Sequence, residues 1–168
     1  MRAEKRDFLE KKMGPAIRGR LERHGQIILT ASGQSMFPYI RQNDLCTFSS
    51  LKDDSDLKKG NIVLYQHQSG RLIAHRLLAK TVDARARACY VIKGDSNILP
   101  DSPVYPDQLL GILTDIRMIS HRIRFSHFFD RTWSRLILGL PILSWTVHKY
   151  LGLRRRAAGL LQITQEKS

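Results

Sequence analysis

Asn61-Ile62-Val63-Leu64-Tyr65 and Leu72-Ile73-Ala74-His75 are two short runs of aliphatic, β-branched and aromatic residues on either side of the turn residues Ser69-Gly70. Such runs, bounded by turn residues, are typical of β-strands. Further runs of this kind precede and follow them, at residues 27–30, 45–48, 89–92 and 110–113. Because no helical pattern separates the runs, the sequence predicts a mainly β body of short antiparallel strands over residues 25–120.

Helical patterns flank this body on both sides. In residues 1–24 apolar side chains recur at mostly three- and four-residue intervals, but Gly14-Pro15 interrupts them, so we expect two short helical pieces or one broken helix. In residues 121–168 aromatic and aliphatic residues, among them Phe125, Phe128 and Phe129, recur at similar spacing between arginines. This pattern predicts a basic amphipathic helical region at the C-terminus.

The net charge of +13 on 168 residues lies mainly at the two ends of the chain. Residues 1–24 contribute +4, residues 25–116 contribute +1 and residues 117–168 contribute +8. A nucleic-acid-binding domain more often carries its basic residues within the fold, so we expect no nucleic-acid partner. A near-neutral body with basic ends fits a domain held at an anionic membrane surface, and solubilising tails are the alternative interpretation.

Several other classes of protein are disfavoured by the sequence. No apolar run reaches about 18 residues, so we expect no conventional membrane-spanning helix. We expect peripheral or interfacial membrane association, and otherwise a cytoplasmic location. Cys46 and Cys89 are too few for a disulfide framework and lack metal-ligand spacing, so we expect no metal or other cofactor.

Gly33-Gln34-Ser35-Met36-Phe37-Pro38 is the most informative motif. Glycine permits close approach of the backbone and proline stiffens the exit, so the Ser35 hydroxyl can be displayed on a fixed turn. Taken alone, a loop serine more often caps local backbone. Two later segments change this interpretation: a strand that carries His75 on the face of Ile73 and Leu77, and the acidic turn within residues 93–101.

Together these motifs resemble the type I signal peptidase family in its endoplasmic-reticulum-like branch, which shares its fold with LexA-like self-cleaving repressors. That branch has Ser-Met-x-Pro, then His-Arg on a strand, then Lys-Gly-Asp-x-Asn followed by a further Asp. Residues 41–45 and 59–63 are similar to the family's Gly-Asp boxes with one position altered in each, and residues 109–113 to its closing strand. The resemblance covers about residues 27–116. It implies a compact signal-peptidase/LexA-like β-fold with helical N- and C-terminal appendages.

The resemblance also implies an activity, that of a serine endopeptidase that removes a leader or signal segment from a precursor protein or peptide. Ser35 is the expected nucleophile and His75 the expected base, at the position where most relatives have a lysine. Burial must lower the pKa of a lysine base by several units, whereas an imidazole is already largely neutral at physiological pH. Asp101 matches the third catalytic residue of the family. Asp95 is expected to organise its loop, although the two roles are open to exchange.

The expected oxyanion hole is formed by the Ser35 N–H and backbone near Gly33, with Ser32 as an alternative donor. Two other functions remain open. One is a catalytically degenerate binding module, against which the intact set of Ser35, His75 and Asp101 argues. The other is a LexA-like regulator, but residues 1–24 are too short for a helix-turn-helix domain and the base position is not a lysine.

Overall fold

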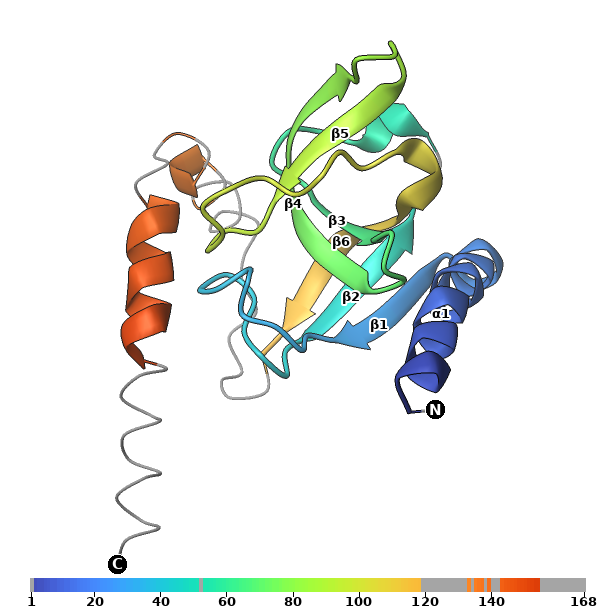
Figure 1. Cartoon of the computed structure of the whole chain (residues 1–168), viewed down its shortest axis with the longest axis horizontal. Helices are drawn as coiled ribbons and strands as arrows, with labels where there is room; N and C mark the ends of the chain where they lie inside the picture. The colour runs from blue at the N-terminus through green and yellow to red at the C-terminus, as the bar shows by residue number, and fades with distance from the viewer. Residues whose placement is uncertain are drawn as a thin grey trace, which may run out of the picture.

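The chain folds around an antiparallel β-sheet in the computed structural model, which describes residues 2–51, 53–118, 133, 135–137, 139 and 143–154. Figure 1 shows the sheet between an N-terminal helix and a C-terminal helix that lie on opposite sides of it. The elements are α1 (Arg2–His24), β1 (Gln26–Thr30), β2 (Leu45–Ser50), the 3₁₀ turn η1 (Asp54–Asp56), β3 (Ile62–Gln66), β4 (Leu72–Val82), β5 (Ala88–Lys93), the 3₁₀ turn η2 (Pro106–Gln108) and β6 (Leu109–Arg117).

The mainly β class and all the predicted strands are confirmed. The strands form a sheet in the order β1-β2-β6-β3-β4-β5, and every neighbouring pair is antiparallel. β3 and β4 form the hairpin expected around Ser69-Gly70, and Gly70 has the positive φ of 87° that this turn requires. β4 is longer than predicted because it continues beyond an irregularity between Leu77 and Ala79 and pairs with β5 as far as Val82.

The sheet has buried clusters on both of its faces, and β3 contributes to each. Ile62 and Leu64 belong to one cluster, while Val63 and Tyr65 belong to the other. This division follows from the alternation of side chains along a strand. His75 pairs with Val63, so its side chain lies on the same face as Val63 and Tyr65.

The N-terminal segment forms one helix, α1, with Pro15 inside it. The sequence allowed two separate helical pieces in this segment, and the structure has one helix instead. Proline removes only one backbone donor, and buried Ile17 and Leu21 attach the following turns to the core cluster. Gly25 ends the helix with a positive φ of 72°. The last turns of α1 belong to the core and are not a peripheral appendage.

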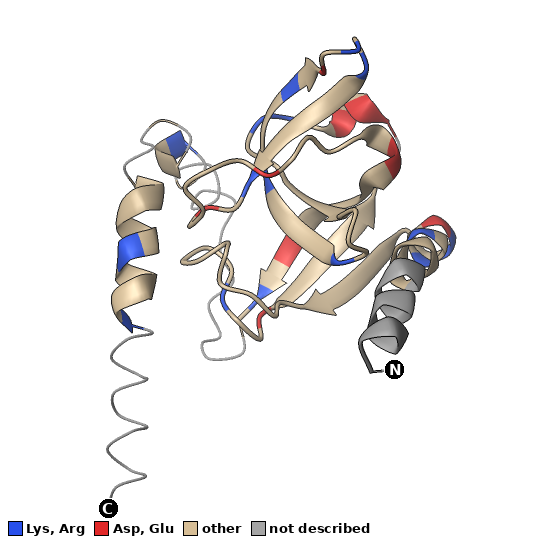
Figure 2. Cartoon of the chain, viewed as in Figure 1, with Lys and Arg blue, Asp and Glu red and all other residues tan. Residues whose placement is uncertain are grey.

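The described charges agree with a near-neutral body. Figure 2 shows Lys and Arg spread over strand ends and loops, while Asp and Glu gather around η1. Asp54 of η1 accepts a hydrogen bond from Lys80 Nζ at 2.7 Å.

The C-terminal region is helical at residues 133, 135–137, 139 and 143–154, which we call the C-terminal segment. Ile137 and Leu151 are buried, whereas Trp145 and Leu153 are exposed. One face of the predicted amphipathic helix therefore packs on the protein, which is an alternative to packing on a membrane. Among the described helices, none is both long and apolar enough to cross a bilayer. Phe125, Phe128 and Phe129 lie outside the described residues.

Candidate active site

Ser35 lies on a tight turn that follows β1 in the chain. The Phe37 N–H donates to the Gln34 carbonyl at 3.0 Å, and the Ile40 N–H donates to the Met36 carbonyl at 2.9 Å. Met36 and Ile40 are buried in the core, and the Phe37-Pro38 peptide bond is cis. The buried side chains that follow Ser35 thus anchor the turn. The close backbone approach expected at Gly33 is not observed, because a Cβ atom added there would meet no described atom within 4 Å.

His75 on β4 lies within hydrogen-bond distance of this serine. Its Nε2 atom is 2.8 Å from the Ser35 Oγ atom, although the two residues are 40 positions apart in the chain. The His75 side chain is almost fully buried. A neutral ring can accept the hydroxyl proton at Nε2 only if its proton is on Nδ1, so the partner of Nδ1 is decisive.

Asp101 is that partner. Its Oδ2 atom lies 2.6 Å from His75 Nδ1, and the Asp101 N–H donates to the Ile92 carbonyl at 2.8 Å. A carboxylate can only accept, so it fixes the tautomer with the proton on Nδ1 and leaves Nε2 free to act as a base. The structure therefore brings together Ser35, His75 and Asp101 in one continuous hydrogen-bonded chain.

Tyr65 on β3 is a fourth member of this chain that the sequence interpretation missed. Its hydroxyl donates to the same Oδ2 atom of Asp101 at 3.0 Å. Its side chain is fully buried, and burial together with the Asp101 carboxylate raises the pKa of Tyr65 above its ordinary value, so it stays a donor. The signal was in the hairpin register, which puts Tyr65 and His75 on one face of neighbouring strands.

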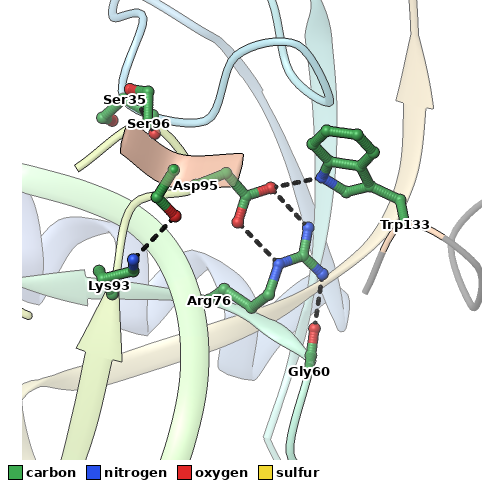
Figure 3. Close-up of polar contacts among 8 residues, drawn as sticks. Ser35, Gly60, Arg76, Lys93, Asp95, Ser96 and Trp133 are labelled. Atoms are coloured by element: carbon green, nitrogen blue, oxygen red, sulfur yellow. Dashed lines mark hydrogen bonds and ion pairs between the residues drawn. The ribbon is translucent and has the colours of Figure 1, made fainter. Parts of the chain in front are cut away.

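Asp95, which the sequence left as a second candidate, does not contact His75. Arg76 Nε donates to its Oδ1 atom and Arg76 Nη2 to its Oδ2 atom, both at 2.8 Å (Figure 3). Trp133 Nε1 donates to Oδ2 at 2.9 Å, so three donors hold this carboxylate. Arg76 also donates to the Gly60 carbonyl at 2.9 Å. The place of Asp95 is a buried ion pair, which corrects its inclusion among the catalytic candidates.

The loop that carries Asp95 is joined directly to the turn of residues 34–40, which carries the candidate nucleophile Ser35 and is called the nucleophile turn. The Ser96 N–H donates to the Ser35 carbonyl at 2.9 Å, and the Ser96 hydroxyl lies 3.0 Å from the carbonyls of both Gln34 and Ser35. Gly94 passes so close that an added Cβ atom would lie 2.8 Å from the Ser35 carbonyl oxygen. A side chain at position 94 would therefore push the two loops apart.

The predicted oxyanion donors lie at the start of the turn. Within the described part of the chain, no acceptor is bonded to the Ser35 N–H, which leaves it available to a substrate oxygen. Gly33 has open space where a side chain would be, and Ser32 is exposed. Donors at these positions can face a negative charge that develops beside Ser35 Oγ.

Other potentially reactive groups do not form a second centre in the described structure. No three His, Cys, Asp or Glu side chains converge as metal ligands among the residues that are described. Cys46 is buried, and burial with the nearby Asp44 carboxylate raises its pKa to about 12. A thiol held in its protonated form is a poor nucleophile.

The arrangement of the three residues can support nucleophilic catalysis by serine. A hydroxyl becomes nucleophilic when a neighbouring base removes its proton, and a third group stabilises the charged base. No protein-family model matches the chain, and no curated protein matches it. Functional assignment therefore depends on the site geometry and on the motif resemblance.

Proposed function

We propose that the chain is a serine endopeptidase of the signal peptidase type. The observation that carries this proposal is the continuous contact from Ser35 Oγ to His75 Nε2 at 2.8 Å and from His75 Nδ1 to Asp101 Oδ2 at 2.6 Å. Both distances are hydrogen-bond distances, and the three side chains come from separate elements. The degenerate-module alternative is disfavoured because none of the three groups is lost or turned away.

The reaction begins when Ser35 Oγ attacks the carbonyl carbon of the scissile peptide bond. His75 Nε2 takes the hydroxyl proton, and the resulting imidazolium is stabilised by Asp101. The Ser35 N–H faces the negative oxygen of the tetrahedral intermediate. His75 then gives its proton to the leaving amine, which breaks the peptide bond and leaves an acyl ester on Ser35. A water molecule, deprotonated by His75, hydrolyses this ester and restores the hydroxyl.

The substrate proposed is a precursor protein or peptide from which a leader or signal segment is removed. An extended segment can add to the edge of a sheet through main-chain hydrogen bonds, which suits a body built of antiparallel strands. Preference for small residues before the cleaved bond follows from the family resemblance.

Peripheral membrane association is part of the proposal. On the helix of residues 143–154, Trp145 and Leu153 are 50% and 65% exposed, and Lys149 Nζ lies 5.6 Å from the Trp145 ring centre. Aromatic, aliphatic and basic side chains on one exposed helix surface are typical of helices that bind at the lipid headgroup boundary.

The test uses a serine-directed fluorophosphonate and a set of peptides that carry small residues. Wild-type protein should be labelled at Ser35 and should cleave a subset of the peptides. Ser35→Ala and His75→Ala should each reduce turnover by roughly 10³-fold or more, because nucleophile and base act as one unit. Ser55→Ala and His24→Ala, both at exposed positions, are the matched controls. Absence of both labelling and cleavage in folded wild-type protein would refute the proposal.

A further inference from the structure

The C-terminal segment contacts the body beside the proposed site. Among the described residues, its polar and aromatic contacts include Phe37 in the nucleophile turn and residues 93–96, which lead into the acidic loop. These two stretches are the ones that the Ser96–Ser35 hydrogen bonds join. The segment therefore contacts both partners of the junction that positions the nucleophile.

Trp133 provides the most deeply placed of these contacts. Its indole N–H donates to Asp95 Oδ2 at 2.9 Å, the same oxygen that accepts from Arg76 Nη2 (Figure 3). A buried carboxylate needs all its hydrogen bonds, because an unsatisfied charge in the interior is costly. Asp95 directly precedes Ser96. The hydrogen bonds that orient the Asp95 side chain therefore also fix the position of the Ser96 N–H, which donates to the Ser35 carbonyl.

The helix of residues 143–154 contacts the same loop at two points. Lys93, the residue directly before Gly94, donates from Nζ to the buried Ser144 hydroxyl at 2.8 Å. The Lys93 side chain is half-buried, and this burial lowers its pKa. His148 Nδ1 lies 3.2 Å from the Ser96 carbonyl and can donate to it. The loop between Lys93 and Ser96 is thus held from the helix side.

The same helix also contacts the nucleophile turn. The Tyr150 ring stacks on the Phe37 ring with centres 6.0 Å apart and planes inclined by 19°. Phe37 is two residues after Ser35, and Tyr150 is two residues after His148. One rigid helix thereby contacts both the turn that carries the nucleophile and the loop that holds its carbonyl.

We infer that the C-terminal segment is a positioning element of the active site, which acts through Trp133 and His148 on the Asp95-Ser96 loop and so on Ser35. This inference rests on the proposed function, because positioning matters only if Ser35 reacts. Trp133 and His148 are positioning residues, since the contacts described for them are to Asp95 and Ser96 and not to Ser35, His75 or Asp101. Loss of their contacts should slow the chemical step and leave substrate binding unchanged.

The test uses full-length Trp133→Phe, which keeps an aromatic ring while it removes the N–H donor and part of the ring volume that packs on the core. We expect kcat to fall roughly tenfold with KM unchanged, and fluorophosphonate labelling of Ser35 to slow by the same factor. His148→Ala should act in the same direction, and because position 148 is exposed the change removes no core packing, so it serves as the second variant. Thr146→Ala, at an exposed position of the same helix whose hydroxyl donates to the Leu143 carbonyl, is the matched control and should stay within about twofold of wild type.

Exchange of the Ser96 amide with deuterium gives a readout that does not need activity. This amide donates to the Ser35 carbonyl, so it should exchange faster in Trp133→Phe and His148→Ala than in Thr146→Ala. If wild-type protein is inactive but the exchange differs as expected, the proposed function fails and the contact of the segment with the loop stands. If kcat, labelling and Ser96 exchange in both variants match the control, the positioning role is refuted.

Discussion

Exchange of one carboxylate for an amide should mainly lower stability at Asp95 and mainly lower turnover at Asp101. The side chains of Asp95 and Arg76 are each 1% exposed, so Asp95→Asn leaves a guanidinium buried without its counter-charge. The new amide nitrogen would also face donors, because Arg76 and Trp133 point N–H groups at the carboxylate. Removal of one partner from a buried pair costs about 3–5 kcal/mol. For a domain of this size that corresponds to a fall in Tm of roughly 6–20 °C.

At Asp101 the main effect should fall on turnover. An asparagine can donate its amide proton to His75 Nδ1, which forces the ring proton onto Nε2 and removes the acceptor for the Ser35 proton. We expect kcat to fall by roughly 10³-fold or more. The side chain of Asp101 is 17% exposed, against 1% for Asp95, so the loss of stability should be the smaller of the two.

Thermal unfolding followed by circular dichroism, urea unfolding and peptide cleavage measure these effects. Asp107→Asn, at an exposed position, is the control and should leave both stability and turnover close to wild type. If Asp95→Asn unfolds within about 1 kcal/mol of wild type with an unchanged urea m-value, the assignment of a buried ion pair is refuted. If Asp101→Asn keeps wild-type turnover, Asp101 is not the partner of His75.

Further outcomes follow from the same geometry. His75→Lys should not restore turnover above that of His75→Ala, because an amine cannot bridge Ser35 and Asp101 as the ring does; equal turnover of His75→Lys and wild type would contradict this. Because the pKa of Tyr65 is raised, folding should retain a proton that the unfolded chain loses above about pH 10. The stabilising contribution of Tyr65 should therefore decline as the pH rises above that value. Urea unfolding from pH 7 to 11 should show a smaller decline in Tyr65→Phe than in wild type, because Cys46 and Tyr90 also have raised pKa values and remain. Full-length protein should co-sediment with anionic vesicles at low salt and less so at high salt, and Trp145→Ala with Leu153→Ala should weaken this binding. Wild-type protein that stays in the supernatant at low salt would refute the membrane proposal.

The strands could be predicted because each is a short apolar run that ends at turn residues. Local sequence was sufficient to predict the strands at Asn61–Tyr65 and Leu72–His75. It was also sufficient to predict that Ser35 is displayed on a turn between glycine and proline. The role of Tyr65 could not be read in this way, because it depends on the register between two strands. Trp133 was harder still. Its partner Asp95 is 38 residues away in the chain, and no spacing in a helical pattern indicates which loop a tryptophan will reach.

Ser35, His75 and Asp101 are far apart in the chain, and this separation determines what labelling with a serine-directed probe would measure. His75 lies 40 residues from Ser35 and 26 from Asp101, and the nucleophile turn is held by a loop 61 residues away. A fragment or partly folded intermediate cannot bring His75 and the Ser96 loop to Ser35 if it lacks either the β3–β4 hairpin or the end of β5. The amount of serine-directed probe incorporated per mole of chain would accordingly count native molecules, and its time course during refolding would report when the last long-range contacts close.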